Sequence, residues 1–359
     1  MQFRVVKKPD ITQKQYTGIM LIAIALALLT SGIFILLLGL NPISVYISMV
    51  KGAFGSPYRI EQTIIVAVPL VIISLGIAVA FKMKFWNIGA EGQVIMGAFF
   101  ASYLALNYPD VPRPFLLLAM MVAGFIGGAL WGLIPAFFKA RWDTNETIVT
   151  LMLNYIALKW ITYLQYGPWK DPNSLGFPKI ANFTDNAVLP KFLGVHLGWV
   201  FALILVVIMY IFMNYSKKGF EIAVLGESLN TARYAGVNIF RTIMFSMFIS
   251  GGICGLAGMI QASAVAHTLN VEIAGGVGFT AIITAWLGGL KPPWIVLVSV
   301  LFAAMVQGGS FIQSAFGISA ASASLIQAMI LFFVLGSDFF TKYRVVISSE
   351  LAHRKGAQE

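Results

Sequence analysis

Charged residues are scarce in this chain. Only 11% of its 359 residues are Asp, Glu, Lys or Arg, whereas 59% are hydrophobic. A typical soluble domain has about 25% charged and roughly 45–50% apolar residues, so a soluble fold could not bury this excess of apolar surface. The mean hydropathy of +0.85 therefore excludes an ordinary soluble protein and indicates a chain whose apolar side chains lie in lipid.

Cysteine and the common catalytic motifs are also nearly absent. Cys254 is the single cysteine, so no intramolecular disulfide can form. The three histidines are far apart and show no zinc-site spacing, and the sequence has no P-loop, G-x-S-x-G or H-E-x-x-H motif. We therefore expect no metal site, no cofactor and no catalytic residues, and any ATP hydrolysis must occur on another subunit.

Long apolar runs predict the fold class: an all-α, polytopic membrane bundle of about ten spans that forms one transmembrane domain over residues 1–359. A span needs about 20 apolar residues. The predicted spans are 17–40, 62–81, 88–107, 114–138, 147–166, 198–215, 242–266, 279–290, 294–315 and 321–340. The eighth is too short to cross as a straight helix, which predicts a half-span or re-entrant segment covered by protein.

The basic residues predict the orientation. With the N-terminus inside, 17 of the 24 Lys and Arg residues fall on cytoplasmic segments, and cytoplasmic loops are enriched in these residues. Both termini, as tails 1–16 and 341–359, are then cytoplasmic. The same bias explains the net charge of +10 without a nucleic-acid partner. The first apolar run is too long for a signal peptide.

Other patterns refine the bundle. Apolar residues at helical spacing over 42–58 predict an interfacial helix in the membrane plane. Pro69 and Pro135 fall inside spans and predict kinks. Two runs of small residues at spacings of three and four predict close helix packing; they comprise Gly124, Gly127, Gly128, Gly132, Gly251, Gly252, Gly255 and Gly258.

The longest internal cytoplasmic loop, residues 216–241, contains the signals of a short helix. Ser228 is a suitable N-cap and Gly236 a suitable residue just after the C-terminus. Gly219 and Gly226 are expected to interrupt the segment that leads to this helix. About two turns of helix are not stable alone, which favours docking into a groove on a partner; an ordinary amphipathic loop helix is the alternative.

Polar side chains inside the spans are candidates for a solute pathway. Glu91 lies near the start of a span beside Asn87 and Gln93, and Asn154 and Tyr155 lie in the first half of another. A carboxylate inside a membrane helix is costly and normally pairs or lines a cavity. The alternatives are helix-end stabilisation for Glu91 and hydrogen bonding between helices for Asn154.

Span 147–166 has two further polar features. Thr144 is a possible cap at its start, next to Asn145 and Glu146. Lys159 falls inside the span, where it either extends its amine toward the membrane surface or pairs with a carboxylate such as Glu272.

The spacing Gly219, Gly226, Ala232, Gly236, Val237 resembles the coupling loop of permease subunits in ATP-binding cassette importers of the ribose and branched-chain-amino-acid type. The stretches Phe85–Gln93 and Asn145–Ala157 resemble its nucleoside and simple-sugar branch. The resemblance covers nearly the whole chain. It implies a bacterial inner-membrane protein that works with a cytoplasmic ATPase, a second permease subunit and an extracytoplasmic binding protein, often a lipoprotein. The ATPase-coupling residues it implies are Gly219, Gly226, Ser228, Ala232, Arg233 and Gly236.

The expected function is translocation of a nucleoside-like or simple-sugar solute that a binding protein delivers. Other ring compounds such as riboflavin are alternatives. An ion-coupled secondary transporter would need carboxylates at mid-membrane, for which Glu91 is the lone candidate. A membrane enzyme would need a catalytic cluster, and a structural scaffold would transport nothing.

Overall fold

The computed structural model describes residues 3–7, 12–174 and 176–347, and these form helices almost throughout. The chain divides into two compact units, residues 1–55 with 305–359 and residues 56–304, which we call unit 1 and unit 2. The predicted tails lie partly outside the described residues, at 1–2, 8–11 and 348–359.

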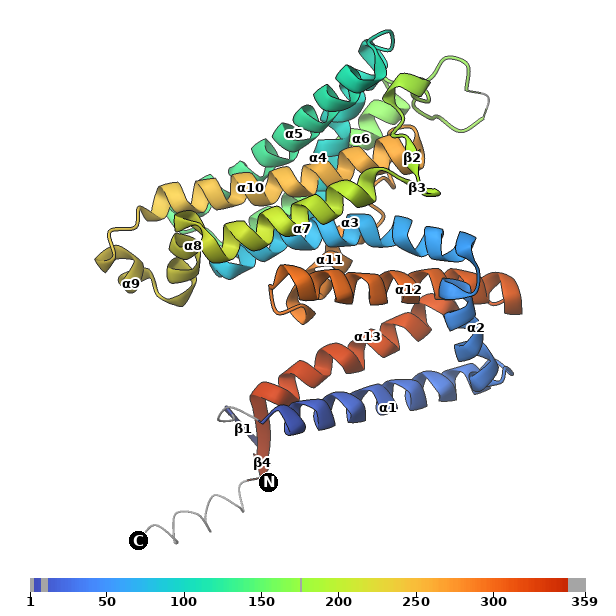
Figure 1. The fold of residues 1–359 in the computed structure, drawn as a ribbon, viewed down its shortest axis with the longest axis vertical. Helices are drawn as coiled ribbons and strands as arrows, with labels where there is room; N and C mark the ends of the chain where they lie inside the picture. Colours follow the sequence, from blue (N-terminus) through green and yellow to red (C-terminus); the bar gives the residue numbers. More distant parts are fainter. Residues whose placement is uncertain (1–2, 8–11, 175, 348–359) are drawn as a thin grey trace. The chain divides into compact units, whose positions relative to one another are not determined.

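Unit 1 contains the first and last helices of the chain (Figure 1). They are α1 (Gln13–Leu37), α2 (Pro42–Phe54), the second half of α12 (Pro292–Phe316) and α13 (Ala320–Lys342). Their core consists of Ile35, Val45, Met49, Ile312, Ala323 and Ile326. The helix predicted within 42–58 is confirmed as α2, which Asn41 caps by accepting hydrogen bonds from two backbone amides.

A short β-ribbon joins the two ends of the chain in unit 1. Strand β1 (Phe3–Lys7) pairs antiparallel with β4 (Tyr343–Ile347), with Phe3 opposite Ile347 and Lys7 opposite Tyr343. The described ends of the chain therefore lie side by side (Figure 1).

Unit 2 contains the remaining helices. They are α3 (Pro57–Lys82), α4 (Ala90–Asn107), α5 (Arg113–Trp142), α6 (Glu146–Tyr166), α7 (Gly198–Tyr215), α8 (Lys217–Glu227), α9 (Leu229–Tyr234), α10 (Ile239–Ile260) and α11 (Val277–Leu287). A π-helical turn, Gln261–Ala266, extends α10. The loop after α6 carries a 3-10 turn, Asp185–Ala187, and the two short strands β2 (Lys191–Phe192) and β3 (Val195–His196).

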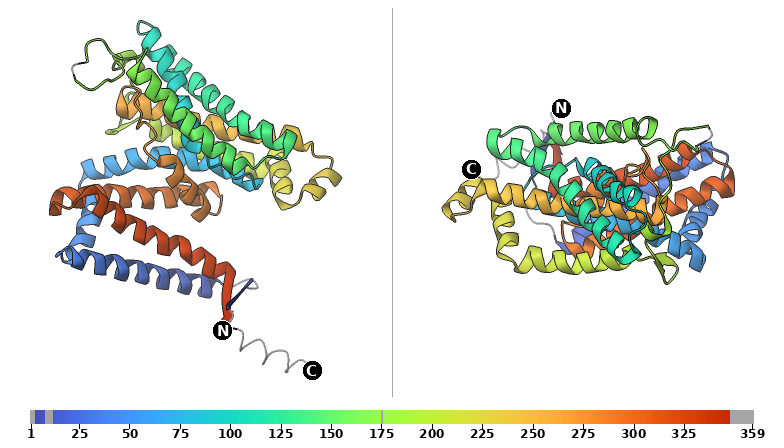
Figure 2. Two further views of the ribbon diagram at one scale, coloured as in Figure 1. Left: turned by 180° about the vertical axis from the view of Figure 1, so that it is seen from behind. Right: turned by 90° about the horizontal axis from the view of Figure 1, so that it is seen from above.

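The glycine faces of α5 and α10 pack closely at the centre of unit 2, as predicted, and Gly97 brings α4 against α10 as well. A Cβ atom at Gly128 would collide with the carbonyl oxygen of Gly251, and one at Gly97 would collide with the backbone of Gly255. Only glycine allows these backbones to approach so closely. Figure 2 shows unit 2 from behind and from above.

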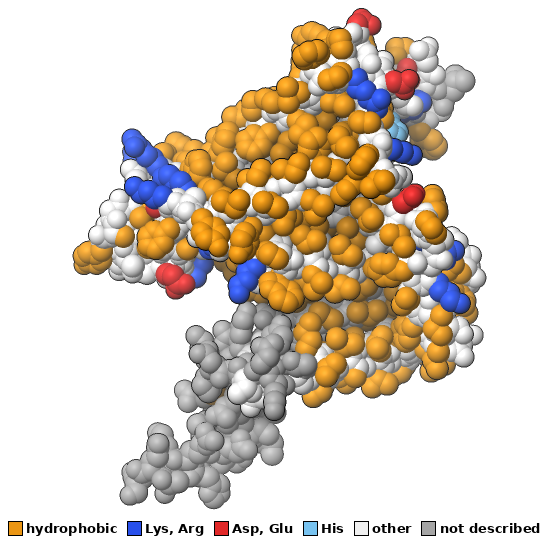
Figure 3. Space-filling view, viewed as in Figure 1, with side chains coloured by type: hydrophobic (Ala, Val, Ile, Leu, Met, Phe, Trp, Pro, Cys, Tyr) orange, Lys and Arg blue, Asp and Glu red, His pale blue; other side chains and the backbone are white. Residues whose placement is uncertain are grey.

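The predicted fold class is confirmed. Eight helices of the described chain are long and apolar enough to cross a membrane by length and composition, and α11 is a shorter apolar helix. Hydrophobic side chains cover the middle of α7 and α10 in Figure 3, whereas charged side chains gather toward the ends of unit 2. Pro69 and Pro135 lie inside α3 and α5, as expected.

The predicted cap at the start of span 147–166 needs correction. Asn145, not Thr144, caps α6, because its side-chain oxygen accepts from the amides of Thr147 and Ile148. The carboxylate of Glu146 is buried and lies 3.2 Å from the Lys139 amine. Asn145 is one residue closer to the helix and has the geometry to reach two free amides.

Candidate functional site

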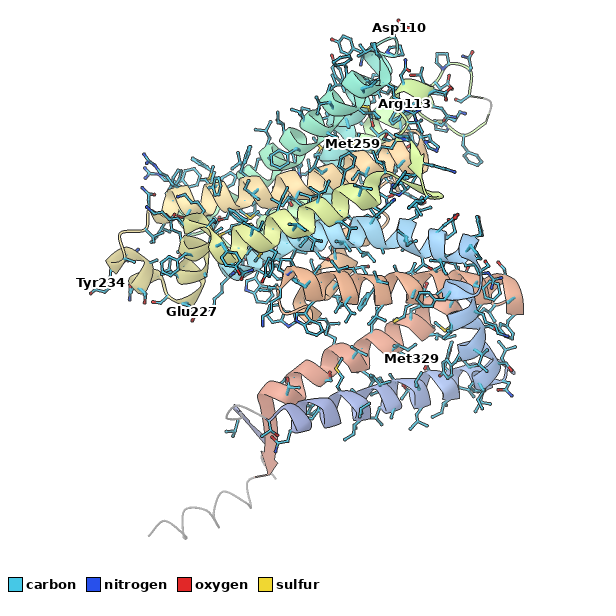
Figure 4. All side chains as sticks on the ribbon, in the orientation of Figure 1. Asp110, Arg113, Glu227, Tyr234, Met259 and Met329 are labelled. Atoms are coloured by element: carbon cyan, nitrogen blue, oxygen red, sulfur yellow. The ribbon has the colours of Figure 1, made fainter. Side chains whose placement is uncertain are left out.

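The short helix predicted in loop 216–241 is confirmed as α9. The Ser228 hydroxyl accepts from the Thr231 amide at 3.3 Å, and Gly236 has a φ of +71° after the helix ends. Ala232 is fully buried, whereas Tyr234 is 94% exposed. Figure 4 labels Tyr234 and Glu227 at one end of unit 2, with Asp110 and Arg113 at the opposite end.

The prediction that Gly219 and Gly226 interrupt the segment before α9 is wrong. Both lie within α8 and are buried. A Cβ atom at Gly219 would collide with the Phe212 carbonyl oxygen, and one at Gly226 with the Lys82 carbonyl oxygen. These glycines therefore allow α8 to lie against the ends of α7 and α3; sequence spacing alone could not distinguish packing glycines from turn glycines.

An ion pair within α8 and one long hydrogen bond to α10 accompany this packing. The Lys218 amine lies 2.7 Å from the Glu221 carboxylate, which also accepts a long hydrogen bond of 3.5 Å from the Thr242 hydroxyl on α10. Arg233, predicted to act in coupling, is exposed on α9. The α8–α9 region thus has an anchored base and an exposed tip.

The polar residues predicted for spans three and five form a buried cluster, with one exception. The amide of Asn87 donates to Gln93 at 3.2 Å and to the Ser250 hydroxyl at 3.3 Å, and the Gln93 amide donates back to Asn87 at 3.2 Å. Ser250 lies halfway along α10, so this polar cluster lies within the bundle. Ser250 was not predicted, because a single serine in an apolar run has no sequence signal.

Glu91 connects two helix N-termini. It lies in the first turn of α4, and its carboxylate oxygens accept from the amides of Gly276 and Gly278, each at 2.7 Å. Those amides are at the start of α11, where unpaired N–H groups and the helix dipole favour a negative charge. The carboxylate therefore caps α11, which the sequence could not show because the contact spans about 185 residues.

Asn154 joins this arrangement, whereas Tyr155 does not. The Asn154 amide donates to the Ile88 carbonyl at 2.9 Å, and its oxygen accepts from the Gly92 amide at 2.8 Å. Asn154 therefore ties α6 to the start of α4. Tyr155 is 57% exposed on another face of α6, and no contact of the described residues brings it to the cluster.

The eighth predicted span is a short helix that follows a non-helical segment, and we call the two together the broken span. Residues 267–276, which we call the connecting segment, have no helix and lead into α11, a helix of 11 residues. The middle of this segment bonds to α6, since the Val271 amide donates to the Gln165 side chain at 3.2 Å. Its last residue, Gly276, bonds to Glu91. Non-helical backbone among membrane spans is tolerated where protein covers it or where it lines a cavity.

Of the two alternatives for Lys159, the ion pair with Glu272 is not formed. Lys159 is exposed on α6, and it forms no ion pair with Glu272 in the described structure. No group of three or more His, Cys, Asp or Glu among the described residues could hold a metal ion.

Comparison with known proteins decides the family. The model of the family described as "Branched-chain amino acid transport system / permease component" matches residues 59–335. The chain belongs to this permease family. It is therefore a multi-pass membrane subunit of a transport system, and the resemblance seen in its motifs is confirmed.

Relatives in this permease family align along most of the chain. A glucose ABC transporter permease protein of Haloferax volcanii is 32% identical, covering 92% of this chain and 90% of its own length. A guanosine ABC transporter permease protein of Bacillus subtilis is 34% identical, covering 88% and 92%. A nucleoside ABC transporter permease protein of Lactococcus lactis is 30% identical, covering 94% and 96%.

Proposed function

We propose that this permease is the transmembrane subunit of an ATP-driven importer in a bacterial plasma membrane, and that its solute is a nucleoside or a simple sugar. The observation that carries the proposal is that relatives with 30–34% identity over nearly the whole chain are named for guanosine, nucleosides and glucose. The permease itself performs no covalent chemistry in this scheme.

The α8–α9 region is the docking site for the cytoplasmic ATPase. Its exposed tip, with Tyr234 and Arg233, is available to a groove on a partner, while Gly219 and Gly226 keep its base against α7 and α3. A movement of α9 is thereby transmitted to the spans. The remaining partners are a second permease subunit and an extracytoplasmic binding lipoprotein that delivers the solute.

Both termini are cytoplasmic in this proposal, and two observations support it. Lys and Arg residues are concentrated on the segments assigned to the inside, and β1 pairs with β4 so that the described ends lie together. The α8–α9 region then lies inside, and the far ends of α4 and α6 lie outside.

The solute moves through the membrane beside the broken span. Half-helix N-termini and unwound segments are where many transporters bind their solutes, and here the first turns of α4 and α11 meet at the Glu91 side chain. Asn87, Glu91, Gln93 and Asn154 supply polar groups along this route. Tyr155 remains a candidate on the exposed face of α6.

Uptake of labelled guanosine and glucose tests the proposal. Cells carry the permease together with genes for a candidate ATPase and binding protein, and the control lacks the permease gene. We expect permease-dependent uptake that stops when ATP is depleted and survives an ionophore. Uptake that follows the ion gradient instead would favour the secondary-transporter alternative, and no uptake of either solute would refute the solute class.

A further inference from the structure

A basic pocket of about 470 Å³ lies in unit 2 where α3 and α7 end and α12 begins. This volume lies in the range of ligand sites, about 300–1,000 Å³. Its lining includes Lys82, Lys291, Tyr210 and Trp294, and it contains no Asp or Glu. None of the residues assigned to the solute route lines it. The pocket is therefore complementary to an anion that the proposed function does not use.

Lys82 is held beside the pocket by α7. It is the last residue of α3, and its amine donates to the Met213 carbonyl at 3.1 Å. An ammonium group has three N–H donors, so two remain for a ligand. The side chain is half-buried, and no ion pair among the described residues involves it. Its charge is thus fixed at the pocket without a carboxylate to neutralise it.

Lys291 lies in the turn between α11 and α12. Gly289 and Leu290 have φ values of +60° and +57°, and the Leu290 amide donates to the Ala285 carbonyl at 3.0 Å. The Lys291 carbonyl accepts from the Ile295 amide at 3.0 Å as α12 begins. The backbone on both sides of Lys291 is therefore fixed by hydrogen bonds, while its side chain is exposed and has no ion pair in the described chain.

Two apolar stripes lead from the pocket along the spans. The stripe on α7 consists of Leu203, Val207 and Tyr210, and that on α12 consists of Trp294, Leu297 and Leu301. All six side chains are exposed, and spacings of three and four residues place each triplet on one face of its helix. Tyr210 and Trp294 also line the pocket, so both stripes begin there. An anionic head with apolar chains matches this combination.

We propose that the pocket binds the phosphate of an anionic phospholipid, at the membrane surface on the side of α8. The amines of Lys82 and Lys291 donate to the phosphate oxygens, and the acyl chains lie along the two stripes. Basic pockets between spans bind anionic headgroups, and Trp and Tyr side chains favour the depth of the headgroups. The bound headgroup joins α3 to the turn between α11 and α12. This lipid site does not depend on the solute and goes beyond the proposed function.

Lipid binding to the full-length permease tests the proposal. The permease, purified in a mild detergent, is titrated with phosphatidylglycerol or with phosphatidylcholine of the same acyl chains, and the bound lipid is counted by native mass spectrometry. We expect phosphatidylglycerol to bind more than about tenfold more tightly, because each lysine near an anionic group contributes about fivefold in affinity. An excess of inorganic phosphate should not displace it, since phosphate lacks the acyl chains.

Substitutions of the two lysines locate the site. We expect Lys82→Gln and Lys291→Gln each to weaken the binding of phosphatidylglycerol about fivefold and to leave that of phosphatidylcholine unchanged. Lys291→Arg keeps the charge and should retain the binding. Arg141→Gln is the matched control, because Arg141 is an exposed cation in the last turn of α5, outside the pocket.

Three results would overturn the assignment. Equal affinity for the two lipids would show that the stripes hold lipid without recognising its headgroup. Displacement by inorganic phosphate would show that the pocket binds a free anion. An equal loss in Arg141→Gln would show that only the general surface charge matters. Should Lys82→Gln not reach the membrane, the two variants of the exposed Lys291 decide the question alone. Each of these results leaves the proposed function unaffected, since uptake is not the quantity measured.

Discussion

The α8–α9 region and the polar cluster around Glu91 are held in different ways. In the first, helix caps act between residues three positions apart, such as Ser228 and Thr231, and the tip is exposed. In the second, hydrogen bonds join helices that are 62 to 187 residues apart in the chain, and the side chains are buried. If the α8–α9 region docks the ATPase as proposed, we expect changes there to uncouple the permease from ATP hydrolysis, whereas changes in the polar cluster should destabilise it.

The largest effect is expected from Glu91→Leu. This change leaves the amides of Gly276 and Gly278 without acceptors, and each buried unpaired group costs about 1–3 kcal/mol. We expect a clear fall in the Tm of the purified permease and in its membrane level. Asp110→Asn is the control, because Asp110 is exposed. An unchanged Tm in Glu91→Leu would show that the carboxylate does not hold α11.

A smaller loss of stability is expected from Gly226→Ala. The added methyl group collides with the Lys82 carbonyl oxygen, and overpacking of this kind costs about 1–3 kcal/mol. We expect α8 to shift and ATP-driven uptake to fall more than the membrane level does. Gly336→Ala in α13 is the matched control, because its methyl group meets open space. Equal uptake and equal membrane levels in the two variants would show that Gly226 is not needed for the packing of α8.

Substitutions at Gly236 test the coupling between the ATPase and the permease, and they cost little folding stability. Its φ of +71° disfavours a β-branched residue by about 1–2 kcal/mol, whereas Asn tolerates this conformation. We expect Gly236→Val to keep normal membrane levels and to lose uptake and stimulation of the ATPase, and Gly236→Asn to retain more of both. Wild-type transport in Gly236→Val would count against docking at α9.

The smallest effect is expected from Tyr155→Phe. Tyr155 is 57% exposed, and substitutions at exposed positions usually change stability by less than about 0.5 kcal/mol. We expect uptake and Tm close to the wild type, whereas Asn154→Leu on the same helix lowers both. A strong loss of uptake in Tyr155→Phe, with normal Tm, would place its hydroxyl on the solute route.

Local patterns were sufficient to predict much of the fold. Apolar runs predicted the long helices, the shortness of α11 and the helix at Pro42–Phe54. The caps of α9 were also predictable, because Ser228 and Gly236 act on their own neighbours. Gly219 and Gly226 were misread, since the same residue type allows either a turn or close packing.

The candidate site was predictable only as a set of residue types. Polar side chains in apolar runs drew attention to Asn87, Glu91, Gln93 and Asn154. Their partners, Ser250, Gly276 and Gly278, come from distant segments and carry no local signal.

Glu91→Gln tests most directly whether the polar cluster lies on the solute route. Gln keeps the size of the side chain and one acceptor oxygen for α11, while the charge is removed. Uptake of guanosine and glucose is measured per folded permease, beside the Tm. We predict that uptake per folded molecule falls and falls unequally for the two solutes. Unchanged uptake per folded molecule, with only a lower Tm, would show that Glu91 holds helices together and nothing more.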